Sequence, residues 1–356
     1  MPHLNRRNLV GAALAAAIVP IASAGQSQQP GPTVWPVPDW PRTNSAEMNV
    51  DPALPELLAN AGAATPSVTG VVVTRAGRIV ADYWADGWGP DDPIDIRSCT
   101  KSVVGALVGR ARHDGLLPDL TVTIGELIPE RIPEGADPAV ANITLWSLLT
   151  MTSGLAWTWQ DDYPRLEAAA DPVALTLGLP IAAPQGTAYV YNSGDSHIIG
   201  LMVAAAARMP LEEYAEEALF APLGITMHGW RRTPQGEVIG GYGLQIVPED
   251  MARLGYLYLR DGAWNGEQLI APEYIEQSII VQSSGDPTGG TPYGYQWWVT
   301  TTWTGYDAFY ALGYGGQYIW VVPALELVIA IAVGDISVPL YPPRPIIEQT
   351  IIPLMY

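Results

Sequence analysis

Residues 95–109 read DIRSCTKSVVGALVG and contain Lys101, the only lysine in a sequence of 356 residues. Every other basic side chain is arginine. Before Ser98 the sequence is typical of strands, whereas after it apolar residues recur at helical spacing until Gly115. We therefore expect a helix to begin at Ser98. Its N-terminus would carry Ser98 and Lys101 on one face, about one turn apart.

This spacing makes Ser98 a candidate nucleophile. A serine hydroxyl is a weak nucleophile until a neighbour takes its proton, and a helix N-terminus favours the negative charge that then develops. Lys101 can take the proton if burial lowers its pKa from about 10.4 toward neutrality, whereas arginine stays protonated. The alternative is a surface lysine in a chain that prefers arginine. The mostly apolar helix, which we expect to be buried, favours the catalytic interpretation.

Two further stretches could complete the site. Tyr191, in YVYNSGDSHIIG at 189–200, precedes a glycine-containing turn that leads into helical sequence at His197. A tyrosine beside a lysine can shuttle protons, although a packed core tyrosine is the alternative. The stretch DAFYALGYGGQYIWVVP at 307–323 is rich in glycine before a strand. Its backbone could lend an N–H to an oxyanion hole together with the N–H of Ser98, or it could be a plain hairpin turn.

Strand-like sequence at both ends of the chain encloses a mostly helical middle. Two β-branched runs flank an Ala-Gly turn within residues 68–87, which predicts a hairpin. A second hairpin is expected where Pro323 and Ala324 separate QYIWVV from LELVIAIAV, and an amphipathic segment at 345–356 closes the chain. This pattern predicts a sheet with strands from both termini and an inserted helical region. The aromatic residues of GYQWW at 294–298 could line a pocket, but we favour a core position.

The N-terminus is typical of an export signal. Arg6 and Arg7 precede an apolar run that is too short for a stable membrane anchor, and Ala22-Ser23-Ala24 matches a cleavage site. We expect a signal peptide at 1–24, of the twin-arginine or the Sec type, and therefore a periplasmic or secreted protein. An ordinary N-terminal helix is the alternative. Residues 25–49 are rich in proline and predict a linker or a wrapping arm.

Composition and motifs exclude several other functions. The formal charge of −19, without a basic cluster after the first residues, argues against nucleic acid as a partner. The sequence has no G-x-S-x-G elbow, no H-E-x-x-H motif and no phosphate-binding loop. Its four histidines show no metal-ligand spacing, so neither a metal nor a cofactor is implied. Cys99 is the only cysteine, which excludes an intrachain disulfide.

The three stretches, in this order, resemble the serine β-lactamase-like superfamily. It includes class C β-lactamases, penicillin-binding proteins, family VIII esterases and nylon-oligomer hydrolases. Ser98-Cys99-Thr100-Lys101 is similar to its Ser-x-x-Lys box, and Tyr191-Asn192-Ser193 is similar to its Tyr-x-Asn box, with serine in place of the usual asparagine. The resemblance extends from about residue 50 to the end, and includes residues 143–157, 222–225 and 243–273.

The resemblance implies a fold and three roles. The fold would be α/β (α+β), of the β-lactamase/transpeptidase type, in a domain at 50–356. A largely antiparallel sheet would be flanked by helices, with a helical region inserted at roughly 98–235 and the active site between them. Ser98 would be the nucleophile and Lys101 its base. Tyr191 would be the general acid and base for the leaving group and the deacylating water.

One departure from the family concerns the third box, usually Lys-Thr-Gly or His-x-Gly. No lysine or histidine follows His228, and the nearest equivalent is Tyr314-Gly315-Gly316, with Phe309-Tyr310 as an alternative register. The missing cation removes the usual partner of a substrate carboxylate, and Ser193 removes an amide that would hold the substrate. The residues expected to bind substrate are Ser193, Gly313, Tyr314, Gly315 and Gly316.

These features favour an exported serine hydrolase that forms an acyl-enzyme on small esters or amides. A β-lactamase or D-Ala peptidase of the same superfamily is the first alternative. A non-catalytic binding protein on this scaffold is the second. The sequence names neither the acyl group nor the leaving group, and it leaves the oligomeric state open.

Overall fold

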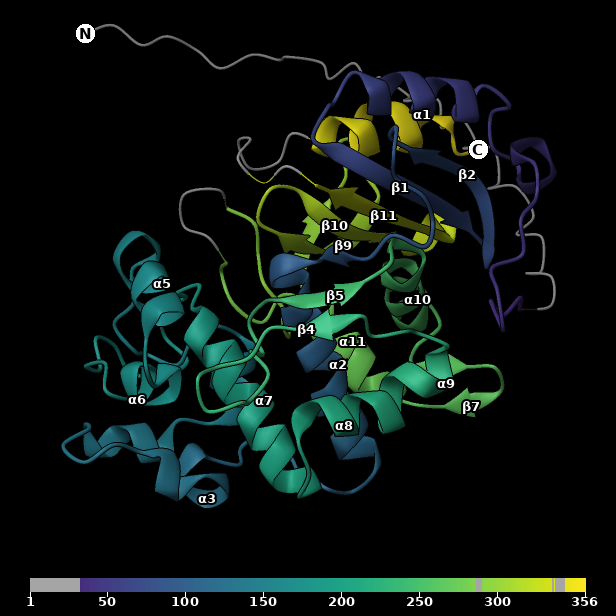
Figure 1. The fold of residues 1–356 in the computed structure, drawn as a ribbon. Helices are drawn as coiled ribbons and strands as arrows, with labels where there is room; N and C mark the ends of the chain where they lie inside the picture. Colours follow the sequence, from purple (N-terminus) through teal and green to yellow (C-terminus); the bar gives the residue numbers. More distant parts are fainter. Residues whose placement is uncertain (1–32, 286–289, 335, 337–342) are drawn as a thin grey trace, which may run out of the picture. The chain divides into compact units, whose positions relative to one another are not determined.

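A six-stranded antiparallel sheet joins the two ends of the chain (Figure 1). The computed structural model describes residues 33–285, 290–334, 336 and 343–356. β1 (Val68–Arg75) pairs with β11 (Leu327–Val333), and the strand order is β2-β1-β11-β10-β9-β8. The other strands of this sheet are β2 (Arg78–Trp84), β8 (Trp298–Thr301), β9 (Asp307–Gly313) and β10 (Gln317–Val322). This sheet, with helices between its two halves, confirms the predicted layout and the α/β (α+β) fold class.

Both predicted hairpins are present. β1 and β2 meet at a turn in which Gly77 has a φ of 80°, a conformation that glycine adopts without strain. β10 and β11 are joined by a 3-10 turn at Pro323–Leu325. The central strands are apolar on both faces: Val71 lies in the core on one side of the sheet and Val72 in the core on the other.

Helices cover both faces of the sheet. α1 (Leu54–Ala63) and a C-terminal π-helical turn (Ile346–Ile351), which lies within the amphipathic closing segment, pack on one face. α10 (Pro248–Leu259) packs on the other face, where a Cβ at Gly255 would lie 2.6 Å from a methyl group of Val328. The absence of a side chain at Gly255 therefore allows the close approach of α10 to the sheet.

The remaining elements form the helical region and two small sheets. The helices are α2 (Thr100–His113), α3 (Ile124–Leu127), α4 (Leu145–Leu149), α5 (Trp159–Ala168), α6 (Pro172–Leu177), α7 (Ser193–Ala207), α8 (Leu211–Ala215), α9 (Ala221–Leu223) and α11 (Pro272–Ser278). The short strands are β3 (Ile94–Asp95), β4 (Gly229–Trp230), β5 (Leu244–Ile246), β6 (Ala263–Trp264) and β7 (Glu267–Gln268). Within the described residues, no helix has the length and apolar character needed to cross a membrane.

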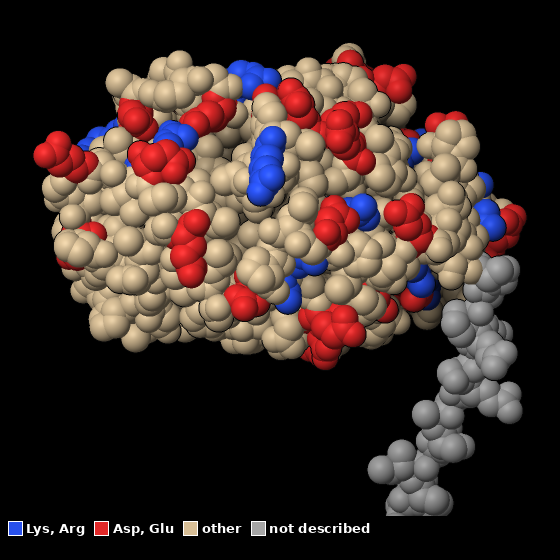
Figure 2. Space-filling model, turned by 90° about the horizontal axis from the view of Figure 1, so that it is seen from below, with Lys and Arg blue, Asp and Glu red and all other residues tan. Residues whose placement is uncertain are grey.

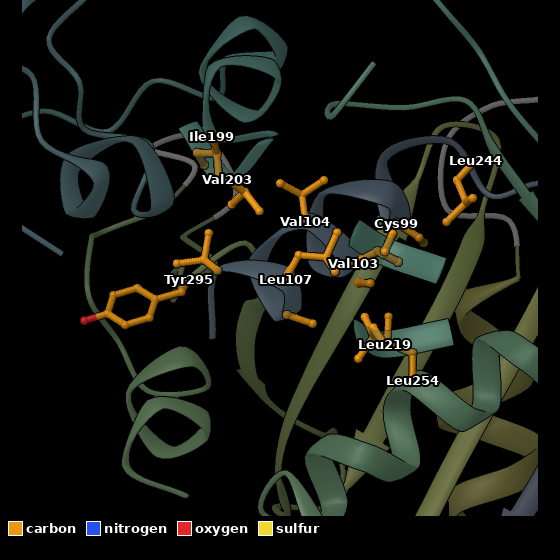
Figure 3. Close-up of a cluster of buried hydrophobic side chains, with 14 of the residues drawn as sticks. Cys99, Val103, Val104, Leu107, Ile199, Val203, Leu219, Leu244, Leu254 and Tyr295 are labelled. Carbon is orange, nitrogen blue, oxygen red and sulfur yellow. The ribbon is translucent and has the colours of Figure 1, made fainter. Parts of the chain in front are cut away.

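α2 is the buried centre of the helical region. Val103, Val104 and Leu107 pack among apolar side chains of α7, α10, β5 and the π-helical turn Glu216–Phe220 (Figure 3). Almost all of α2 is inaccessible to solvent, as its apolar sequence predicts. A single 3-10 turn, Arg97–Cys99, precedes α2 and contains Ser98. The expected helix start at Ser98 is therefore confirmed to within one turn.

The N-terminal part of the described chain lies along α10. Tyr256 donates a hydrogen bond from its hydroxyl to Val34 O at 2.8 Å, and Arg253 donates one to Pro38 O at 2.9 Å. Trp40 is buried and donates its indole N–H to Glu249 O. Residues 34–40 thus make the contacts of an arm. The predicted signal at 1–24 lies outside the described residues.

The visible charges agree with an acidic protein. On the face shown in Figure 2, arginine side chains lie singly among more numerous aspartates and glutamates. This face therefore offers no continuous basic surface for a nucleic acid backbone.

Candidate active site

The amine of Lys101 lies at the centre of the candidate site. Its Nζ is within hydrogen-bond distance of Ser98 Oγ (3.1 Å), Ser193 Oγ (3.1 Å) and the carbonyl oxygen of Gly241 (2.7 Å). The same Nζ lies 4.9 Å from the centre of the Tyr191 ring. The structure therefore brings together the residues that the first two boxes predicted.

Burial changes the protonation of this amine. Lys101 is only 1% exposed, and the loss of hydration lowers its pKa to about 7. A lysine with such a pKa is largely neutral in mildly alkaline solution and can accept a proton there. The surface interpretation of Lys101 is excluded.

A tight backbone turn presents Ser98 to Lys101. Arg97 has a φ of 52°, a left-handed conformation that is costly for a residue with a side chain. Asp95 supports the turn because its Oδ1 accepts the Arg97 N–H at 2.8 Å. Thr100 also supports it, because its hydroxyl donates to the carbonyl oxygen of Arg97 at 2.6 Å. Ser98 itself is half-buried and contacts Lys101, so part of this residue stays accessible to solvent.

The second box forms the N-terminus of α7. The helix begins at Ser193, earlier than the expected start at His197, because Asn192 caps it: its Oδ1 accepts the Gly194 N–H at 2.7 Å. Gly194 thus belongs to the first helical turn rather than to a separate turn. Ser193 is wholly buried and contacts Lys101, and its assignment to substrate binding stays a prediction.

The third stretch meets the Ser98 turn at Gly313. This residue ends β9, and a Cβ there would lie 2.5 Å from the carbonyl oxygen of Ile96, two residues before Ser98. Gly315 and Gly316 form the turn between β9 and β10 instead, with φ angles of 91° and 111°.

The rest of the predicted third box lies away from this contact. Cβ atoms at Gly315 and Gly316 would approach Ile336 and Pro343, whereas Phe309 and Tyr310 are buried within the sheet. Tyr314, at the turn, is 42% exposed. Their substrate-binding roles stay predictions, and the geometry favours a register in which Gly313 lies at the site.

Sequence reasoning missed Gly241, whose carbonyl oxygen makes the shortest contact to Lys101. A Cβ at Gly241 would lie 2.7 Å from the carbonyl oxygen of Ser193, and one at Gly240 would lie 2.5 Å from that of Ser196. Only a pair of glycines lets this loop approach α7 so closely. The Gly-Gly dipeptide at 240–241 was the available signal.

Sequence reasoning also missed Gln296, which ties three helices together. Its backbone carbonyl oxygen accepts the Ser102 hydroxyl of α2 at 2.6 Å, and its Oε1 accepts the Ser196 hydroxyl of α7 at 2.7 Å. Its Nε2 donates to the carbonyl oxygen of Leu149 in α4 at 2.9 Å. One buried amide therefore fixes the helices that carry Lys101 and Ser193, and no local pattern marks it.

In this site a serine contacts a buried lysine, and a tyrosine that precedes a helix lies beside the same amine. This arrangement is the one expected of serine β-lactamase-like hydrolases. The chain belongs to this family: the family model described as Beta-lactamase matches residues 54–334. The resemblance inferred from the sequence is confirmed, and the protein is a serine hydrolase of the β-lactamase family.

Individual relatives agree with this assignment. The chain is 22% identical over 286 residues to 6-aminohexanoate-dimer hydrolase of Paenarthrobacter ureafaciens. The alignment covers 72% of this chain and 70% of that protein. Its fold is similar to that of a Bacillus anthracis protein assigned as a 6-aminohexanoate-dimer hydrolase (TM-score 0.72, 19% identity, 89% and 88% covered). It is also similar to a D-stereospecific amidohydrolase from Streptomyces sp. (TM-score 0.66, 16% identity, 84% and 99% covered).

We predict that the carboxyl of Asp195 makes stability depend on pH. It is fully buried on α7 and accepts a hydrogen bond from Asn192 Nδ2, and burial raises its pKa from 3.8 to about 8. Between these values the folded protein keeps a proton that the unfolded chain releases, so the free energy of unfolding falls as pH rises, by roughly 1.4 kcal/mol per pH unit.

Asp195→Asn removes this titration and keeps an oxygen for Asn192. Urea unfolding of both proteins should give a stability difference in favour of the variant that grows from pH 4 to pH 8. A difference that stays constant over this range would contradict the prediction.

Proposed function

We propose that the protein is an exported serine hydrolase that forms an acyl-enzyme on Ser98 and hydrolyses carboxylic esters or small amides. The observation that supports it best is the 3.1 Å contact between Ser98 Oγ and the amine of Lys101, whose pKa burial lowers to about 7. The substrate would be a small molecule, and the mechanism proposed below uses no cofactor.

A neutral Lys101 amine can keep all three of its contacts. Such an amine has two N–H groups and one lone pair. The N–H groups can be donated to Ser193 Oγ and the carbonyl oxygen of Gly241, which leaves the lone pair for the hydroxyl proton of Ser98. Ser193 and Gly241 would thus orient the base toward the nucleophile.

Acylation then follows in balanced steps. Lys101 takes the Ser98 proton as Oγ attacks the substrate carbonyl carbon, and backbone N–H groups at Ser98 and at the end of β9 would stabilise the oxyanion. Tyr191, whose ring adjoins Lys101, would hand its proton to the leaving oxygen or nitrogen as the bond from that atom to carbon breaks, and would then take the Ser98 proton from Lys101. In deacylation a water molecule would attack the acyl carbon while Lys101 or Tyr191 takes its proton. The bond between Ser98 Oγ and the acyl carbon then breaks, Oγ takes that proton, and the carboxylic acid leaves.

The charges near the site favour substrates without a carboxylate. The guanidinium of Arg97 is paired with Asp95 at 3.4 Å, and that of Arg231 with Glu167 at 2.7 Å. A substrate carboxylate would therefore compete with these acidic side chains for a cation. β-Lactams and D-Ala-D-Ala peptides carry such a carboxylate, whereas an ester or simple amide need not.

We predict that Ser98→Ala abolishes hydrolysis of a p-nitrophenyl ester series from acetate to octanoate. Lys101→Arg should do the same, because a guanidinium cannot accept the proton; we expect losses of roughly a thousandfold or more in kcat. Ser45→Ala is the matched control, since this buried hydroxyl bonds to the carbonyl oxygen of Val80 on β2 and has no contact with Lys101. In the native enzyme, kcat/KM should fall as pH drops through about 7, because protonated Lys101 has no free lone pair.

Equal rates in the native enzyme and in Ser98→Ala would contradict the assigned nucleophile. Turnover of nitrocefin without turnover of esters or amides would favour a β-lactamase instead. Failure of a fluorophosphonate to label Ser98, together with no hydrolysis of any of these substrates, would favour a binding protein.

Export is a separate part of the proposal. It is supported by Arg6-Arg7, the apolar run after them and Ala22-Ser23-Ala24. We predict that the protein recovered outside the cytoplasm begins at Gly25, which N-terminal sequencing or intact mass would check. An uncleaved N-terminus in that fraction would contradict the predicted signal.

A further inference from the structure

Two tryptophans from distant parts of the chain contact Tyr191. The ring centre of Trp159, on α5, lies 6.1 Å from that of Tyr191. The ring centre of Trp298, on β8, lies 5.7 Å away and is stacked at an interplanar angle of 28°. Tyr293 lies edge-on to both Tyr191 (6.3 Å) and Trp298 (4.8 Å). The candidate general acid therefore adjoins two indole rings, one of which is stacked on its own ring.

Some rings of this aromatic cluster are buried, and others are partly exposed. Tyr242 and Tyr293 are 2% and 1% exposed, and their rings contact those of Tyr163 and Trp298, respectively. Trp159, Tyr163 and Trp298 are only half-buried, and Tyr163 stacks on Trp159 at 4.4 Å. We call these three residues the aromatic shelf. Flat, partly accessible aromatic surfaces next to a catalytic group can stack on a planar ligand.

The charged groups beside the shelf are acidic side chains and the arginines that pair with them. Tyr163 donates its hydroxyl to Glu167 at 3.3 Å, and the same carboxylate oxygen pairs with Arg231. α5 itself carries Asp161, Asp162 and Glu167, and Asp162 pairs with Arg165 at 2.5 Å. An anionic ligand would have to compete with these carboxylates for the arginines, so the shelf suits an uncharged ligand.

We propose that the aromatic shelf binds the leaving group and favours uncharged, planar aromatic alcohols or amines over saturated ones of the same size. The inference rests on the proposed function, in which Tyr191 protonates the leaving atom. That atom must then lie within hydrogen-bond reach of the Tyr191 hydroxyl, and its substituent must lie against the rings that flank Tyr191. Selectivity for the leaving group would thus come from α5 and β8.

The test compares two esters that differ only in the leaving ring. Benzyl butanoate and cyclohexylmethyl butanoate share the acyl group, and their alcohols are similar in size and acidity. One stacked aromatic contact is worth a few-fold to about tenfold. We therefore expect the native enzyme to favour the benzyl ester by about three- to tenfold in kcat/KM.

The variants locate the preference. Trp159→Leu and Trp298→Leu should each bring the benzyl to cyclohexylmethyl ratio toward one, and Trp159→Phe should keep most of it because an aromatic face remains. Trp303→Leu is the matched control, since this tryptophan is 59% exposed and packs near Arg344, not Tyr191. Thermal melting would check that each variant is folded. If Trp159→Leu does not fold, Trp159→Phe and Trp298→Leu still test the role of the shelf.

The outcomes separate this inference from the proposed function. A benzyl to cyclohexylmethyl ratio near one in the native enzyme, or an unchanged ratio in both leucine variants, would contradict the shelf inference. The proposed function would still hold in that case if hydrolysis depends on Ser98. If Ser98→Ala cleaves both esters as fast as the native enzyme, or if no ester or amide is cleaved, the proposed function fails and the shelf inference fails with it.

Discussion

The structure depends on keeping one amine out of water. Lys101 lies on a helix that is buried on nearly every side, and its Nζ contacts the oxygen atoms of Ser98, Ser193 and Gly241. Desolvation makes the charged form costly, and this cost is what turns a lysine into a base near neutral pH. Arginine could not serve, because its guanidinium stays protonated under the same conditions.

The surrounding fold keeps this environment rigid. The sheet closes the two ends of the chain against each other through β1 and β11, and Gly313 at the end of β9 abuts the backbone before Ser98. On the opposite side, Gln296 holds α2, α4 and α7 in register through its amide and carbonyl groups. A small displacement of any of these elements would lengthen the contacts of Lys101 and admit water to it.

Hydrophobic periodicity and turn residues were enough to predict the helix after Ser98 and both hairpins. The serine–lysine spacing, the helix after it and both hairpins follow from periodicity and turn residues, and the structure has all of them. The α7 start was placed too late, because capping by Asn192 outweighs the turn preference of Gly194. Gly241 and Gln296 act through contacts with residues far along the chain, which periodicity does not encode. The aromatic residues at 294–298 were expected in the core. This is right for Trp297, but Trp298 faces the other way along the strand and stacks on Tyr191.

The most direct test of the account is the titration of Lys101 itself. Because the sequence contains one lysine, selective ¹³Cε labelling gives a single lysine signal in the NMR spectrum of the whole protein. The account predicts a midpoint of about 7 in the folded protein, and a return to about 10.4 when urea unfolds it. A midpoint near 10.4 in the folded, active enzyme would show that Lys101 is charged at working pH, and would contradict its role as the base.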